Sequence, residues 1–260
     1  MEKQAIPVRF VLSGGGTRGF AHLGMIAALI EFGCKPTAYC GASAGAVAGA
    51  FLSAGYKPEE VLGIFQSMKP STFASIAFNE GLLSTKSLTS FFEKHLPATF
   101  EDLLFPLCIV ATDLSSGNWK SFHSGELKQV LAGSCAIPGL FKPVVFKDML
   151  LADGGILNNL PVEAVPVAEG KVAGLHVNPV AQVDVSSSAF RILERTFHLG
   201  VYSNTIFRTG LCDSYLEPRE LAGYRVFDFS SLKEVYQIGY DYVLSDAARI
   251  LEELSISYSD

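Results

Sequence analysis

The sequence predicts a single α/β domain built on a mostly parallel central sheet with helices covering both faces. The chain has 260 residues, of which 49% are hydrophobic and 18% charged, a composition that suits one large domain with a substantial core. Apolar strand-like runs recur and helical patterns lie between several of them, which is typical of parallel strands joined by crossover helices. These runs are 8–13, 37–42, 105–112, 144–152, 172–177 and 224–229.

The first strand leads into a cluster of glycines and then a helix. Strand 8–13 runs into the segment GGGTRG at 14–19, and apolar residues with helical spacing follow from Phe20 to Ile30 and stop at Gly33. The glycines place free backbone N–H groups at the positive end of this helix, an arrangement that binds an anion. The anion is either a phosphate group or the oxyanion of an acyl-transfer intermediate.

Nucleotide binding is one interpretation of these glycines. Gly14, Gly16 and Gly19 satisfy G-x-G-x-x-G, but the dinucleotide-binding fingerprint also expects an acidic residue at the end of the second strand. The second strand, 37–42, has no carboxylate, and Glu31 falls earlier, within the first helix. No Gly-Lys-Ser/Thr follows the glycines, as a P-loop would require. The sequence therefore disfavours a nucleotide site.

The second strand ends in the pentapeptide GASAG, residues 41–45, ahead of a run of small helix-forming residues. This G-x-S-x-G pattern is typical of a nucleophile elbow, a sharp strand-to-helix turn that exposes the serine hydroxyl. Gly41 and Gly45 suit such a turn because side chains at those positions would clash. Taken alone, the pattern also fits an ordinary packed turn in a chain rich in Gly and Ala.

The third motif is LADGG at 151–155, after the apolar run 144–152, which we expect to form a hairpin with Lys147 and Asp148 at its turn. Alone, an aspartate followed by two glycines is more typical of a turn than of a site. Beside the elbow and the glycine loop, Asp153 becomes a candidate base for Ser43. A carboxylate with an ordinary pKa of about 3.9 is a poor base unless burial raises that pKa. The apolar residues 149–152 are consistent with such a dry setting.

The three motifs, in this order, resemble the patatin-like phospholipase family, which pairs a G-G-G-x-[RK]-G loop with a G-x-S-x-G serine and a D-G-[GA] aspartate. The resemblance covers about residues 8–166, with further matching stretches at 111–114, 134–144 and 158–161, and no catalytic position departs from the family pattern. It implies a serine acyl hydrolase that cleaves lipid esters, of the phospholipase A or lysophospholipase type. The implied substrate is a lipid ester, and no cofactor is implied.

The resemblance also implies a role for each motif residue. Ser43 is the nucleophile and Asp153 the general base, while Arg18 supports the glycine loop or meets a substrate phosphate. The oxyanion hole is formed by the backbone amides of Gly14, Gly15 and Gly16. The remaining motif residues support the local backbone and are Gly19, Gly41, Gly45, Gly154 and Gly155.

Three other functions remain open. An acyltransferase would pass the acyl group from the same acyl-enzyme to another acceptor. An α/β-hydrolase triad would take His176 or His198 as its base, although only about two strands precede Ser43, fewer than that fold normally has. A lipid-binding regulator without activity is the third, but it has no chemical reason to keep all three motifs.

Composition disfavours several other classes of protein. A formal net charge of −6 leaves no basic face for nucleic acid. The five histidines and five cysteines form no metal-ligand cluster and no C-x-x-C pair, so we expect no metal and reduced, buried thiols. The uncharged stretch 36–56 is too rich in Gly, Ala and Ser for a membrane span, and the first residues hold no signal-peptide core. We therefore expect a cytoplasmic protein, with peripheral membrane contact left open.

The residues from 167 onward are expected to complete the sheet and add covering helices, so that 1–260 form one domain without repeats or linkers. Ser231 and Glu234 form a candidate capping box for a final helix that runs towards Leu254. Two apolar stretches, 68–92 and 190–207, either wall an acyl pocket, touch a bilayer, or pack on the sheet as ordinary amphipathic helices.

Overall fold

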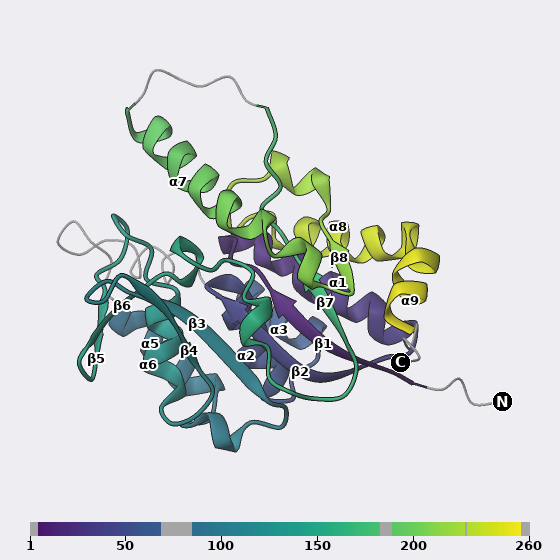
Figure 1. Ribbon diagram of the computed structural model, residues 1–260, viewed down its shortest axis with the longest axis horizontal. Coiled ribbons are helices and arrows are strands. Elements are labelled where there is room, and N and C mark those ends of the chain that lie inside the picture. Colours follow the sequence, from purple (N-terminus) through teal and green to yellow (C-terminus); the bar gives the residue numbers. More distant parts are fainter. Residues whose placement is uncertain (1–4, 69–84, 183–188, 227, 256–260) are drawn as a thin grey trace.

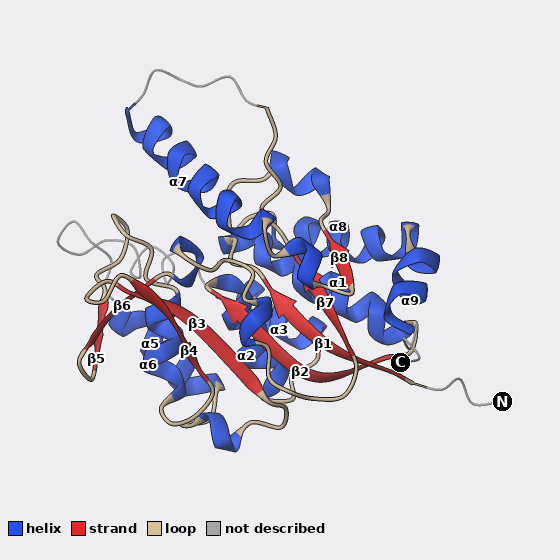
Figure 2. Cartoon of the chain, in the orientation of Figure 1, coloured by secondary structure: helices blue, strands red, loops and turns tan. Residues whose placement is uncertain are grey.

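The computed structural model describes residues 5–68, 85–182, 189–226 and 228–255. One mixed sheet with helices around it forms the body of the molecule, which confirms the predicted fold class (Figure 1, Figure 2). The strands are β1 (Ile6–Leu12), β2 (Cys34–Ala42), β3 (Leu107–Asp113), β4 (Asn118–Phe122), β5 (Val144–Phe146), β6 (Met149–Ala152), β7 (Lys171–Leu175) and β8 (Ser214–Leu216).

Strand β1 lies inside the sheet, whose order is β5-β6-β3-β2-β1-β7-β8, with β4 also paired to β3. Strands β1, β2, β3, β7 and β8 are parallel, whereas β4 and β6 run antiparallel to β3. The chain passes from β1 to β2 on one side and returns later to β7 on the other. The carboxyl end of β1 is therefore a topological switch point, the position at which open α/β sheets bind their ligands.

The helices are α1 (Phe20–Glu31), α2 (Ala44–Ser53), α3 (Pro58–Gln66), α5 (Thr85–His95), α6 (Leu127–Ser134), α7 (Ala189–Ile206), α8 (Leu232–Ser245) and α9 (Ala247–Ser255). Short 3-10 turns are η1 (Gly16–Gly19), η2 (Phe100–Asp102), η3 (Gly154–Ile156), η4 (Val162–Ala164), η5 (Thr209–Leu211) and η6 (Arg219–Gly223). The larger core joins the sheet to α1, α2, α6 and α8, and a smaller one packs Leu160 and Val162 on Val11 and Val110.

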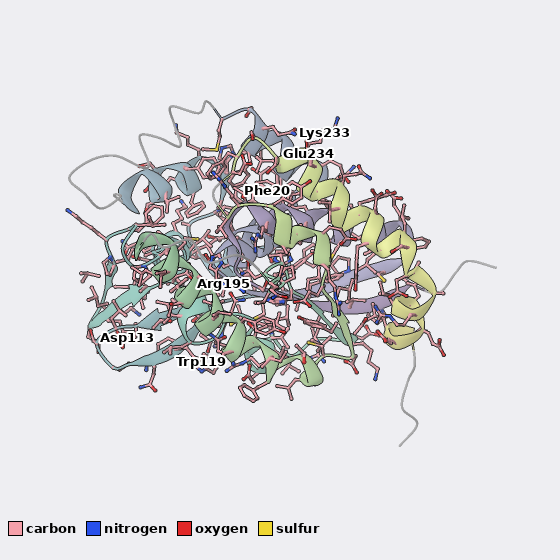
Figure 3. All side chains as sticks on the ribbon, turned by 90° about the horizontal axis from the view of Figure 1, so that it is seen from above. Phe20, Asp113, Trp119, Arg195, Lys233 and Glu234 are labelled. Atoms are coloured by element: carbon pink, nitrogen blue, oxygen red, sulfur yellow. The ribbon has the colours of Figure 1, made fainter. Side chains whose placement is uncertain are left out.

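Helix α1 is buried along its length because it lies between the sheet and α8. Every residue from Phe20 to Leu29 is buried, as expected of a helix that is apolar on all sides. A methyl group at Gly24 would sit 1.9 Å from the Tyr236 carbonyl oxygen, so only glycine permits this approach to α8. Figure 3 shows Phe20 near the start of α8, marked by Lys233 and Glu234. The helix ends before Gly33, as predicted.

The predicted strand at 224–229 is wrong. Its described residues, 224–226 and 228–229, follow η6 as irregular backbone, and the short strand β8 completes the sheet instead. The alternating apolar pattern is real, but the carbonyl groups of Tyr224 and Val226 accept hydrogen bonds from Arg18 and Thr17 rather than from a neighbouring strand. Tertiary contacts therefore override the local strand pattern.

The predicted capping box at the start of the last helical region does not form. Helix α8 begins at Leu232, where expected, but Ser231 has φ −101° and ψ 11° and its hydroxyl donates to the Asp228 carbonyl. That backbone conformation is not the extended one in which a capping side chain reaches the first turn. The helix also breaks at Asp246, so α8 and α9 are separate.

The other predicted elements lie close to their expected positions. The hairpin at 144–152 is formed by β5 and β6, with Lys147 in the left-handed region at φ 55°. The stretch 190–207 falls on α7, and most of 68–92 lies outside the described residues. Within the described ranges, none of the helices combines the length and apolar character needed to cross a bilayer.

Candidate active site

Ser43 lies at a sharp turn between β2 and α2. Its φ of 51° and ψ of −124° are unfavourable for a residue with a side chain, as expected at a nucleophile elbow. The turn is tight: a methyl group at Gly45 would sit 2.1 Å from the Leu12 carbonyl oxygen, and one at Gly41 2.5 Å from the Gly45 carbonyl carbon. Glycine is therefore required on both sides of Ser43.

A second helix fixes the elbow. The Ser43 amide donates to the Ser134 hydroxyl at 2.9 Å, and that hydroxyl donates to the Val110 carbonyl at 2.6 Å. Ser134 is the last residue of α6 and Val110 lies in β3, so the strained turn is tied to two neighbouring elements. Strain of this kind persists only where the surrounding structure over-determines it.

Asp153 faces Ser43 from the end of β6. The Ser43 Oγ donates to Asp153 Oδ2 at 2.6 Å, and Asp153 Oδ1 accepts from the Gly155 amide at 2.8 Å. The backbone is held as well, because Thr112 donates its hydroxyl to the Asp153 carbonyl at 2.9 Å. At Gly154 a methyl group would sit 2.2 Å from the Val110 carbonyl oxygen, which explains the glycine after the aspartate.

Burial brings the pKa of the Asp153 carboxyl group closer to neutral pH. The residue is 4% exposed, and burial raises its carboxyl pKa to about 6 even though the hydrogen bonds from Ser43 and Gly155 lower it. A base works best with a pKa near the working pH, so this carboxylate is ionised at neutral pH yet able to take a proton.

The glycine loop after β1 lies against the elbow. A methyl group at Gly14 would sit 3.1 Å from the Ser43 Cβ, and one at Gly19 would sit 2.7 Å from the Ala44 Cβ. Gly14 was predicted as part of the oxyanion hole, but its amide donates to the Asn159 carbonyl at 3.3 Å. Among the described residues the amides of Gly15 and Gly16 have no acceptor, so these two amides can meet an oxyanion.

Arg18 is buried beneath this loop and does not point to solvent. Its Nε and Nη2 donate to the Tyr224 carbonyl at 2.8 and 2.6 Å. The Thr17 amide donates to the Val226 carbonyl at 2.8 Å beside it. Together they fasten the loop to the segment after η6, which favours a supporting role for Arg18 over contact with a phosphate.

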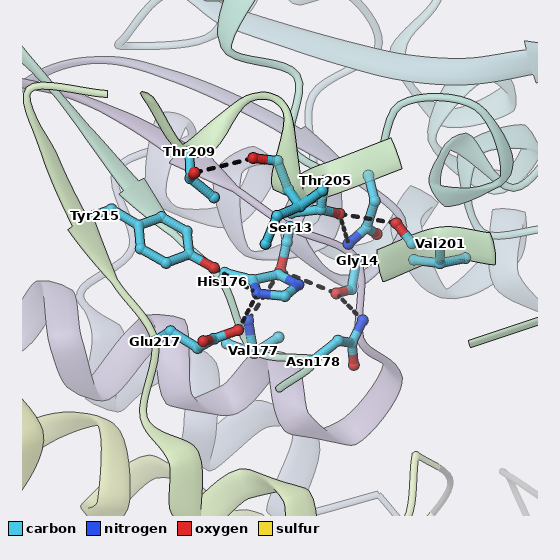
Figure 4. A network of polar contacts seen from close by, with 12 residues as sticks. Ser13, Gly14, His176, Val177, Asn178, Val201, Thr205, Thr209, Tyr215 and Glu217 are labelled. Atoms are coloured by element: carbon cyan, nitrogen blue, oxygen red, sulfur yellow. Dashed lines mark hydrogen bonds and ion pairs between the residues drawn. The ribbon is translucent and has the colours of Figure 1, made fainter. Parts of the chain in front are cut away.

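A polar network holds the start of the loop (Figure 4). The Ser13 hydroxyl donates to the Gly14 carbonyl at 3.0 Å and accepts from the Val177 amide at 3.1 Å. Asn178 donates to the same Gly14 carbonyl at 2.7 Å. Sequence patterns gave no role to Asn178, Asn159 or Ser134, because such support has no local signature. The stretches 134–144 and 158–161 match the family pattern and contain Ser134 and Asn159, so they are the sequence signal that could have pointed to these two residues.

The histidines of the alternative triad have other surroundings. His176 Nδ1 lies 2.7 Å from Glu217 Oε1 and 2.9 Å from the Tyr215 hydroxyl, and its Nε2 has no hydrogen-bond partner among the described residues (Figure 4). His198 is half-buried on α7. Neither histidine bonds to Ser43, whose hydroxyl donates directly to the carboxylate of Asp153.

An apolar cavity of about 110 Å³ opens beside the elbow. Its wall includes Gly16, Ala44 and Val47, so it lies between the glycine loop and the first turns of α2. The rest of the wall is formed by Thr17, Gly19, Phe20, Leu23, Ala48, Val61, Phe65 and Phe229. The composition of this wall suits a hydrocarbon chain.

No metal centre is assembled in the part of the chain that the structure describes: no three His, Cys, Asp or Glu side chains there are placed to hold an ion. All five cysteines are free thiols. The absence of a catalytic metal stays a prediction.

The fold and the site together define a class of α/β proteins in which a serine at a nucleophile elbow bonds directly to an aspartate beside a glycine loop. The chain belongs to the patatin-like phospholipase family, whose model matches residues 10–166. This confirms the resemblance proposed from the three motifs.

The chain matches only part of the length of its curated relatives. An NTE family protein of Mycobacterium bovis is 34% identical over 186 residues, which are 70% of this chain and 49% of the relative. The lysophospholipase NTE1 of Cryptococcus neoformans is 27% identical over 192 residues, 69% of this chain and 12% of that protein. The chain thus spans half or less of the length of these relatives.

Among solved structures, VipD from Legionella pneumophila has a similar fold. The TM-score is 0.55 with 15% sequence identity, over 95% of this chain and 67% of VipD. At this identity the likeness concerns the fold alone.

Proposed function

We propose that this chain is a serine acyl hydrolase that cleaves lipid esters through Ser43 and Asp153. The observation that carries the proposal is the 2.6 Å hydrogen bond from Ser43 Oγ to Asp153 Oδ2 at a strained elbow. A serine hydroxyl is a weak nucleophile and needs an adjacent base, and here the base is in direct contact.

The reaction can be written from this geometry. Ser43 Oγ attacks the ester carbonyl carbon while its proton passes to Asp153 Oδ2, and the amides of Gly15 and Gly16 stabilise the oxyanion. Asp153 then protonates the departing alcohol, leaving an acyl-enzyme. Water attacks that ester, Asp153 takes its proton, and the collapse of the second intermediate returns the proton to Ser43 and releases a carboxylic acid.

The acyl part of the substrate is a lipid chain. The apolar cavity beside Ala44 and Gly16 supports this because an acyl group bonded to Ser43 Oγ has an apolar space within reach. Membership of the phospholipase family and a relative named as a lysophospholipase favour a phospholipid or lysophospholipid. We also propose that the protein contacts a lipid surface when it acts on such a substrate.

Labelling with a fluorophosphonate probe tests the nucleophile. We expect the full chain to be labelled and to hydrolyse members of a mixed phospholipid, lysophospholipid and triglyceride panel. Ser43→Ala should lose both properties while still unfolding in one cooperative transition. An unlabelled wild-type chain, or full activity in Ser43→Ala, would move the chemistry elsewhere. Adding an alcohol acceptor to the same assay separates hydrolysis from acyl transfer by the product formed.

A further inference from the structure

Helix α7 extends away from the sheet (Figure 1). It presents an uncharged, largely apolar face to solvent. Ile192, Leu199 and Ile206 recur every seven residues and are 46%, 44% and 44% exposed, and Leu193 beside them is 68% exposed. Thr196 and Ser203 lie between them at helical spacing. We call these six residues the outer stripe of α7.

The outer stripe is unusual for a surface helix, whose solvent face is normally charged. Among the charged residues of α7, Arg191 and Glu194 fall at other positions around the helix. Arg195, labelled in Figure 3, borders the stripe as a cation whose Nη2 donates to the Ala181 carbonyl at 2.8 Å. Four exposed aliphatic side chains on one face mark an interaction surface rather than scattered surface residues.

The C-terminal part of α7 is fastened to the candidate active site. Asn204 Nδ2 donates to the carbonyls of Gly155 and Ile156 at 2.9 and 3.1 Å, and its Oδ1 accepts from the Asn159 amide at 2.9 Å. Gly155 is the residue whose amide bonds to Asp153. One side chain therefore joins α7 to the loop that holds Asp153, so the helix that carries the outer stripe is anchored at the candidate active site.

We infer that the outer stripe of α7 docks the protein on a neutral, zwitterionic lipid surface. The inference rests on the proposed function, because a lipid substrate is what brings a lipid surface to this site. The choice of a neutral surface comes from the stripe itself: none of its six residues is charged, so apolar contact rather than ion pairing with lipid headgroups drives docking, and the chain's net charge of −6 gives an anionic membrane no overall advantage.

Vesicles of phosphatidylcholine test this docking with the full chain. The test variant is Leu193→Glu combined with Leu199→Glu. Its control is Leu104→Glu, because Leu104 is 70% exposed but precedes β3, at the opposite end of the strands from the site. We expect the double variant to sediment with vesicles at least tenfold less than wild type, and the control to sediment as wild type does.

Hydrolysis supplies the second measurement. The double variant should lose at least tenfold in rate on a vesicle-borne ester and stay within twofold of wild type on a dissolved short-chain ester. Binding measured with Ser43→Ala needs no chemistry, so the docking proposal survives or fails independently of the proposed reaction.

Several results would overturn the inference. The inference fails if the double variant and wild type sediment equally, or if wild type does not bind phosphatidylcholine vesicles. It also fails if 0.5 M salt abolishes binding, because the binding would then be driven by charge. A wild-type dimer that the double variant converts to a monomer would assign the stripe to a second copy of the chain instead.

Discussion

Among single residues, the direct contact between Ser43 and Asp153 is what separates this site from a histidine triad. Asp153→Asn should lower kcat on a soluble ester by about two to four orders of magnitude, because the amide cannot take the serine proton. His176→Gln should stay within about tenfold of wild type, since His176 bonds to Glu217 and Tyr215 rather than to the nucleophile. Steady-state rates on folded variants check this, and equal losses in both would bring back the triad.

The burial of Asp153 also costs stability. Because its folded pKa is raised to about 6, the folded state keeps a proton that the unfolded state releases above about pH 4. The free energy of unfolding therefore falls as pH rises from about 4 to about 6. Asp153→Asn does not titrate, so at pH 7.5 it should be more stable than wild type by up to about 3 kcal/mol, an advantage that vanishes near pH 4. Urea unfolding at several pH values measures this.

Asp113 is a control of opposite sign. Hydrogen bonds from the Ser116 hydroxyl and from the amides of Leu150 and Ser115 lower the pKa of its carboxyl group. Its ionised form is therefore favoured by folding, and Asp113→Asn should be less stable than wild type at pH 7.5. A stabilised Asp113→Asn, or an Asp153→Asn less stable than wild type at that pH, would contradict the burial argument.

Among the secondary-structure elements, the turn η1 begins at Gly16, one of the two glycines whose amides we propose to bind the oxyanion. Gly16 has φ 56°, and a methyl group there would sit 2.2 Å from the Val226 carbonyl oxygen, so Gly16→Ala must displace the loop. Loss of oxyanion donors typically costs about a hundredfold or more in kcat. Kinetics on a soluble ester test this against Gly63→Ala on α3, where a methyl group meets open space. Wild-type kcat in Gly16→Ala would exclude the loop from the reaction.

Helix α2 begins at the turn that holds Ser43 and forms part of the cavity wall. Val47 lies one turn after Ser43 and lines the cavity, so Val47→Phe should fill part of its volume. We expect at least a tenfold fall in the ratio of long-chain to short-chain ester hydrolysis, with Val145→Phe, on the exposed edge strand β5, unchanged. A chain-length series of esters measures that ratio, and an unaltered ratio would place the acyl chain elsewhere.

Across the whole molecule, the site depends on residues beyond 166, where the family match ends. Strand β7 pairs with β1, α8 covers α1, and the carbonyl groups of Tyr224 and Val226 hold the glycine loop. A chain cut after residue 166 should therefore lack a cooperative unfolding transition and fail to label with fluorophosphonate. Circular dichroism melting and labelling test this, and a folded, labelled fragment would contradict the single domain proposed for 1–260.

The local structures of this protein could be predicted from its sequence alone. The elbow at 41–45, the glycine loop at 14–19 and the hairpin at 144–152 depend on glycines and on short turns, whose conformation is set by neighbouring residues. Their order along the chain was enough to indicate the family and to propose Ser43 and Asp153 as a pair.

The way in which these turns meet depends on the tertiary structure. Ser43 and Asp153 are 110 residues apart, and their 2.6 Å contact requires β2, β3 and β6 to lie side by side, which no local pattern states. Asn204 and the Tyr224 carbonyl support the site from distant segments for the same reason. The segment after η6 has a strand's alternation but bonds to Arg18 and Thr17, because a buried polar backbone takes the partners that the packed fold supplies.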